Sequence, residues 1–149
     1  MTDIEFRFNL PNPVDYACRL LRKGVMQGGA QLVVTGDATT LDAVDAALWQ
    51  TEATDFLAHC REDASQDVLQ RSPVVLASAP DVSLPHHSVL VNLGTQIPMG
   101  FERFERLIEL VGEDEAARGA GRLRWRHYKD RGYGIRHQDA FGSATGQAS

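Results

Sequence analysis

The densest group of residues that could do chemistry is a basic segment near the C-terminus. Between positions 118 and 136 one acid, Asp130, accompanies seven cations, which are Arg118, Arg122, Arg124, Arg126, Lys129, Arg131 and Arg136. At about 100° per residue a helix would place four side chains on one stripe beside Tyr128, namely Arg118, Arg122, Trp125 and Lys129. Cations interleaved with aromatic rings suit an acidic peptide that carries an aromatic side chain. The alternative is a solvated basic face with Trp125 packed sideways against the core.

The helix dipole does not account for this basic stripe. Acids at Glu113 to Glu115 and bases further along complement the dipole, but its effect fades within the first and last turns. Arg118 and Arg122 lie too far inside the helix for it. Gly119 and Gly121 each weaken helix propensity by roughly 1 kcal/mol relative to Ala, so we expect this helix to depend on docking onto the domain.

Nucleotide chemistry finds no support in the sequence. The first apolar strand leads into Pro11, Asn12 and Pro13, and no glycine-rich phosphate loop of either common type is present. The pair Gly28-Gly29 follows a predicted helix, where it is best explained as a stop signal.

Metal and nucleophile chemistry are equally unsupported. The pair His86-His87 has no partner at ligand spacing, so we interpret it as a turn or surface pair. The serines that could be nucleophiles, Ser78, Ser83 and Ser88, lack the context of a nucleophile elbow. We therefore predict no catalytic, cofactor-binding or metal-binding residue.

Composition narrows the class of protein. The chain has 149 residues, 43% of them hydrophobic, and a net charge of -5, which disfavours a general coat for nucleic acid. Cys18 and Cys60 lie far apart and suggest neither a disulfide framework nor a zinc finger. The N-terminus lacks the pattern of a signal peptide and no apolar run is long enough to span a membrane, so we predict a cytoplasmic protein.

The first half of the chain predicts a strand, a helix and a second strand. Alternating apolar residues indicate a strand over Ile4–Leu10, helical spacing follows over Val14–Met26, and a short apolar run covers Gln31–Thr35. This order favours parallel pairing through a right-handed crossover. Thr39 or Thr40 can cap a second helix that ends at Trp49.

The second half predicts two further strands, Pro73–Ala77 and Ser88–Leu93, and two helices, Phe101–Val111 and Glu113 to about Arg131. The fold class is therefore α/β, with a mostly parallel, Rossmann-like sheet flanked by helices in three layers. We predict a single domain over residues 1–138 and a flexible C-terminal tail over 139–149, which is rich in Gly, Ser, Ala and Gln.

Four segments in order resemble the chi subunit of the bacterial DNA polymerase III holoenzyme. They are Leu41–Trp49 with Asp55-Phe56 after it, Val89–Leu93, Gly100–Val111 and Arg124–Lys129. Each segment is weakly specific, but the ordered set spans most of the domain. The resemblance implies a non-enzymatic accessory of the clamp loader that pairs with the psi subunit and grips the acidic C-terminal tail of single-stranded DNA-binding protein. Contact with single-stranded DNA would then be indirect, and no cofactor or membrane would be involved.

The resemblance also assigns residues to the two partners. It implies that Val111, Tyr128 and Lys129 form part of the tail pocket, with Arg124 or Arg126 as nearby cations. An arginine of the family aligns with Trp125.

For psi, the resemblance points to the segment after the second helix, including Trp49 and Phe56. Core packing is the alternative for Trp49, and we favour it there more than for Phe56, which has polar neighbours.

Two other functions remain open from the residues alone. One is a small nucleic-acid-binding module that uses the basic last helix, which would bind nucleic acid with a steep salt dependence. The other is a small nucleotide-dependent enzyme, which would require the phosphate loop that this sequence lacks.

Overall fold

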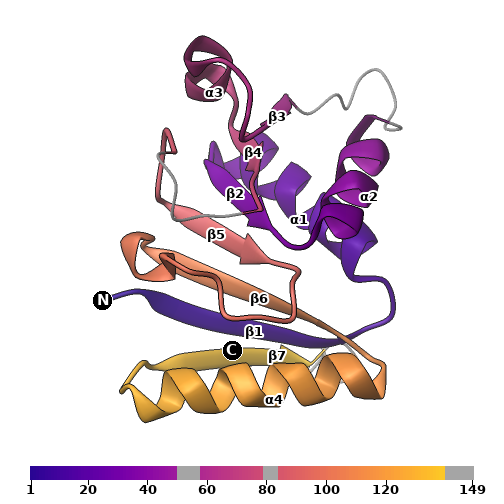
Figure 1. Cartoon of the computed structure of the whole chain (residues 1–149), viewed down its shortest axis with the longest axis vertical. Coiled ribbons are helices and arrows are strands. Elements are labelled where there is room, and N and C mark those ends of the chain that lie inside the picture. Colours follow the sequence, from indigo (N-terminus) through magenta and orange to yellow (C-terminus); the bar gives the residue numbers. More distant parts are fainter. Residues whose placement is uncertain (50–57, 79–83, 140–149) are drawn as a thin grey trace.

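The computed structural model describes residues 1–49, 58–78 and 84–139, which form an open sheet with helices on both faces (Figure 1). The strands are β1 (Asp3–Leu10), β2 (Leu32–Thr35), β3 (His59–Arg61), β4 (Val74–Leu76), β5 (Val89–Asn92), β6 (Arg106–Gly112) and β7 (Ile135–Asp139). The helices are α1 (Pro13–Gly28), α2 (Ala38–Trp49), α3 (Gln66–Arg71), α4 (Glu115–Asp130) and the short 3-10 helix η2 (Phe101–Arg103).

The strands lie in the order β3-β4-β2-β5-β6-β1-β7, and every neighbouring pair is parallel. The predicted α/β class with a Rossmann-like sheet is therefore confirmed. The predicted pairing of the first two strands is wrong, because β5 and β6 lie between β1 and β2. A long crossover through α1 carries the chain across the middle of the sheet instead of to the adjacent position.

Each face of the sheet has its own core. On one face α1 and α2 pack with residues such as Leu21 and Val44 against β2 and β6. On the other face α3, α4 and η2 pack against Phe6 and Leu107. All four residues of β2 are buried, as expected for a parallel strand covered on both sides.

The helix α1 begins and ends at the residues that its sequence favours. The Asn12 side chain accepts a hydrogen bond from the Asp15 backbone N–H at 3.1 Å, and Pro13 follows in the first turn. Gly29 adopts a left-handed conformation with φ of 62° and ends the helix, which confirms Gly28-Gly29 as a stop signal.

The predicted helix Phe101–Val111 is wrong. The segment forms η2 and then strand β6, which is buried on both faces: Ile108 and Leu110 lie on the α1 side, Leu107 and Val111 on the α4 side. An apolar run that is buried on both faces cannot be distinguished from a helix by periodicity alone.

Three short elements were not predicted: β3, α3 and β7. The strand β7 ends at Asp139, where the predicted tail begins, and residues 140–149 lie outside the described residues. Of the two alternatives for His86-His87, a turn or a surface pair, the surface one is wrong for His86, which lies outside the helices and strands but is only 7% exposed. Within the described ranges no helix is long and apolar enough to cross a membrane.

Candidate functional site

A cleft of about 430 Å³ lies between α4 and the strands β1 and β7. Its walls combine cations from α4, aromatic rings from three elements, and a floor that includes Val111 of β6. These chemical types are the ones that the sequence analysis singled out on the last helix. We call this site the α4 cleft.

The helix α4 is capped by the residue before it and lies unusually close to the sheet. The Asp114 side chain accepts a hydrogen bond from the Ala117 backbone N–H at 2.8 Å. A Cβ at Gly121 would lie 3.1 and 3.2 Å from the two γ carbons of Val111. Glycine at this position therefore allows α4 to pack closely on β6, next to the floor of the α4 cleft.

Aromatic rings form one wall of the α4 cleft. The centroid of the half-buried Trp125 ring lies 5.0 Å from that of Phe6 and 5.7 Å from that of His137, both in tilted geometry. The His137 ring in turn lies 6.0 Å from Phe8. These contacts hold Trp125 in place and leave a preformed apolar surface facing the cleft.

Arg118 and Arg122 supply the positive charge of the α4 cleft, one helical turn apart. Their side chains are 49% and 62% exposed, and both lie near the Glu115 carboxylate, at 4.0 and 3.3 Å. Glu115 is itself 81% exposed, and ion pairs this exposed contribute little to stability. A carboxylate-bearing ligand could therefore replace Glu115 at small cost.

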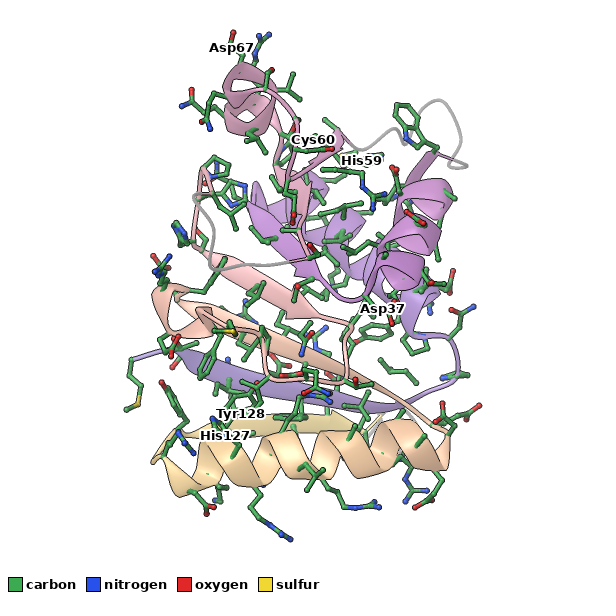
Figure 2. All side chains as sticks on the ribbon, in the orientation of Figure 1. Asp37, His59, Cys60, Asp67, His127 and Tyr128 are labelled. Atoms are coloured by element: carbon green, nitrogen blue, oxygen red, sulfur yellow. The ribbon has the colours of Figure 1, made fainter. Side chains whose placement is uncertain are left out.

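Beneath α4 a buried carboxylate accepts hydrogen bonds from three side chains. Glu109 is 0% exposed and accepts hydrogen bonds from Arg124 Nε at 3.0 Å, from Asn92 Nδ2 at 2.9 Å and from the Tyr128 hydroxyl at 2.5 Å. Figure 2 shows Tyr128 on the side of α4 that faces the sheet. A buried charge that is paired and hydrogen-bonded in this way fixes the rotation of α4 about its own axis.

Burial also changes the titration of this group of residues. It raises the pKa of the Glu109 carboxyl, while the Arg124 guanidinium opposes that shift. Burial and the adjacent Glu109 raise the pKa of Tyr128 well above its ordinary value, so the hydroxyl stays protonated and donates. The predicted helix Phe101–Val111 would place Glu109 on its polar face, whereas in strand β6 this residue is buried.

The residues predicted for the tail pocket fall into three groups. Val111 and Trp125 line the α4 cleft. Arg124 and Tyr128 lie beneath α4 and are 3% and 0% exposed. The other two, Arg126 and Lys129, are exposed on α4 but do not line the cleft.

Sequence reasoning missed several residues of the α4 cleft, chiefly Phe6, Phe8 and His137. The alternation in β1 indicated that the two phenylalanines share one face, but not that α4 covers that face. His137 lies in β7, a strand whose sequence is mostly polar and gave no signal. Arg118 and Arg122 were found on the correct stripe, without assignment to the pocket.

The predicted psi-facing residues lie away from this cleft. Trp49 ends α2 and is 61% exposed, so the core-packing alternative is wrong. Its ring centroid lies 5.1 Å from that of His59, whose Nε2 lies 2.9 Å from the Asp45 carboxylate. Phe56 lies outside the described residues.

The fold and the α4 cleft define an all-parallel α/β protein with a groove of about 430 Å³ that is lined by two arginines and several aromatic rings. Over residues 1–136 the chain matches the family described as DNA polymerase III chi subunit, HolC, and it belongs to that family. A curated relative is the DNA polymerase III subunit chi of Pseudomonas aeruginosa, which is 32% identical over 119 residues. The match covers 78% of this chain and 79% of the relative, and it confirms the resemblance stated above.

A solved structure with a similar fold is the C-terminal domain of the DEAD-box protein Dbp5. It has a TM-score of 0.59 and 13% sequence identity, and the match covers 93% of this chain and 90% of that one. At this identity the likeness concerns the fold alone.

Proposed function

We propose that this chi-family protein is a non-catalytic, cytoplasmic adaptor of the polymerase III clamp-loader assembly. In this role it binds the acidic C-terminal tail of single-stranded DNA-binding protein in the α4 cleft and the psi subunit at a separate surface. The observation that carries the proposal is the pairing of exposed guanidinium groups with a preformed aromatic wall in one groove. Family membership supports the assignment to the polymerase III assembly.

The chemistry of such a tail matches the two walls of the α4 cleft. Aspartates of the tail would replace Glu115 at Arg118 and Arg122, forming charge-assisted hydrogen bonds. The aromatic residue at the end of the tail would pack against Trp125 over the Val111 floor. Arg126 and Lys129, exposed on the same helix, would increase the rate of encounter by long-range attraction.

Arg124 and Tyr128 take a different role in this proposal from the one that the resemblance implied. Both are buried and engaged with Glu109, so they would act by holding α4 rather than by touching the tail. A substitution at either position would therefore weaken tail binding through the position of α4.

For psi the best candidate surface on described residues is the end of α2. Trp49 is an exposed tryptophan whose neighbour His59 is held by Asp45, and such anchored aromatic side chains often dominate protein interfaces. We retain Phe56 as a proposed psi contact from the family resemblance.

The experiment that tests the proposal is a titration of the full chain with a labelled acidic peptide that matches the C-terminus of single-stranded DNA-binding protein. A copy lacking the final aromatic residue, and a labelled single-stranded oligonucleotide, provide the comparisons. We expect the full peptide to bind, the truncated copy to bind at least tenfold more weakly, and binding to fall as salt rises.

Failure of the peptide to bind at moderate salt, together with binding of the oligonucleotide, would overturn the adaptor assignment. It would favour the nucleic-acid module, against which the net charge of -5 stands.

A further inference from the structure

A second cavity, of about 390 Å³, lies at the carboxyl edge of the sheet where the chain leaves β2, β4 and β5. We call it the edge pocket. Its lining includes Thr35 at the end of β2 and Asp37 after it, Ser78 after β4, and the loop Gly94–Met99 after β5. The α4 cleft shares none of these residues.

The topology of the sheet places the edge pocket where open α/β sheets commonly bind ligands. After β2 the chain enters α2, which packs on the α1 face of the sheet. After β5, the neighbour of β2, it enters η2, whose Phe101 packs on the opposite face. Adjacent strands whose connections diverge to opposite faces leave a crevice between their carboxyl ends.

One carboxylate dominates the electrostatics of the edge pocket. Among the described residues that line it, Asp37 is the one with a formal charge. Asp37 lies just before α2 (Figure 2). Its Oδ1 accepts a hydrogen bond from the Thr40 backbone N–H at 2.8 Å. Hydrogen bonds from Thr40 lower the pKa of Asp37, so this exposed group is ionised at neutral pH.

The loop on the other side of the edge pocket is held in place by two members of the buried polar cluster under α4, Arg124 and Asn92. Arg124 Nη1 donates to the Thr95 carbonyl at 3.0 Å, and Asn92 Nδ2 donates to the Gln96 carbonyl at 3.1 Å. The same loop supplies an apolar rim that includes Ile97 and the 71% exposed Met99. The pocket therefore combines a fixed polar wall with an apolar surface at its mouth.

Phosphate ligands are poorly suited to this pocket. The start of α2, whose free N–H groups could bind an anion, is already occupied by the Asp37 carboxylate. A second anion there would meet like charge, and the described residues of the lining offer no cation to offset it. A cation with an apolar stem fits both the carboxylate and the rim.

We propose that the edge pocket receives an arginine side chain from a partner protein, with its guanidinium on Asp37 and its stem along Met99 and Ile97. Arginine suits the site because its planar group pairs with a carboxylate in two-point geometry. The inference goes beyond the adaptor role proposed above, since it uses different residues and a ligand of opposite charge.

The test is an NMR titration of the full chain with Nα-acetyl-arginine amide, whose guanidinium is its one charge, at constant ionic strength. We expect the amide resonances of Gly36 and Gly94 to shift, and the citrulline analogue, which lacks the charge, to bind at least fivefold more weakly. The variant Asp37→Asn should weaken arginine binding similarly, while Asn still caps α2.

The matched control is Asp42→Asn, which removes an acid from α2, the helix that Asp37 caps, outside the edge pocket. It should bind arginine amide like the original chain. Equal binding of the citrulline analogue, no effect of Asp37→Asn, or preferential binding of AMP would overturn the inference. Tail binding, measured separately, would remain intact in Asp37→Asn, so failure here is distinguishable from failure of the adaptor role.

Discussion

The α4 cleft and the edge pocket have similar volumes, about 430 and 390 Å³, but opposite electrostatics. In the first, Arg118 and Arg122 outnumber the single acid Asp139 and stand beside aromatic rings. In the second, the carboxylate of Asp37 stands among neutral side chains of the described lining. The volume of a cavity alone therefore does not indicate what either site binds. Two or three charged side chains decide the class of ligand.

The two sites also share a support. Arg124 bonds to Glu109 under α4 and to the Thr95 carbonyl at the wall of the edge pocket. One buried guanidinium therefore positions the helix of the first site and the loop of the second. Variants that remove this support should affect both sites, and variants at the surface should affect one.

The largest expected effect comes from Glu109→Ala. It leaves the buried Arg124 without its carboxylate, which should lower the free energy of unfolding by about 3–5 kcal/mol, measured by urea denaturation. Glu102→Ala, at an exposed carboxylate, should change it by less than about 0.5 kcal/mol. A stability unchanged by Glu109→Ala would show that the two sites do not depend on a common support.

The next largest effect is a loss of peptide affinity at the α4 cleft alone. The double variant Arg118→Glu with Arg122→Glu should weaken binding of the acidic tail peptide on the order of 100-fold in fluorescence anisotropy, because two charge-assisted contacts become repulsive. Arginine amide should still bind at the edge pocket.

A charge-matched control separates local contact from overall charge. The variant Lys23→Glu with Arg71→Glu makes the same change in net charge at exposed positions away from the α4 cleft. It should reduce tail binding by less than about threefold, since screened surface charges act weakly at a distance. An equal loss in both double variants would mean that the cleft makes no specific contact.

A smaller effect is expected from Trp125→Ala. Loss of the ring should weaken binding of the full tail peptide about tenfold. Binding of the truncated peptide, which lacks the final aromatic residue, should be almost unaffected. Isothermal titration calorimetry of both peptides against both chains gives the coupling directly. If both peptides lose the same affinity, Trp125 does not contact the aromatic end.

The smallest effect is a pH dependence at the edge pocket. Thr40 lowers the pKa of Asp37 in the folded chain, so Asp37 adds stability above its unfolded pKa of about 3.9, and this is lost as pH falls through the lower folded value. Between about pH 5 and pH 3 the original chain should therefore lose more stability than Asp37→Asn, whose cap does not titrate. Parallel thermal melts would reveal the difference, and superimposable pH profiles would contradict it.

Much of the fold could be predicted from the sequence because its early elements obey local rules. The alternation of Ile4–Leu10 and the glycine stop of α1 act over a few residues, and both were found correctly. The prediction of a helix over Phe101–Val111 failed because β6 is buried on both faces, and this burial removes the alternation that identifies a strand.

The candidate site was predictable only in part for a different reason. The stripe that holds Arg118, Arg122 and Trp125 follows from helical geometry, so it could be identified from spacing. Whether Arg124 points outward depends on Glu109, a residue fifteen positions earlier that pairs with it only in the folded chain. The histidine His137 required knowledge of β7, whose polar sequence gives no strand signal.

The position of β1 in the sheet determines when this strand can pair during synthesis of the chain. Its two neighbours in the sheet, β6 and β7, are both formed by residues after position 105. During synthesis on the ribosome, both edges of β1 therefore stay unpaired until nearly the whole chain has emerged. In the sequence α4 lies between β6 and β7, so the proposed tail-binding groove would form in the same late step that completes this part of the sheet. A partly synthesised chain would therefore not bind the tail.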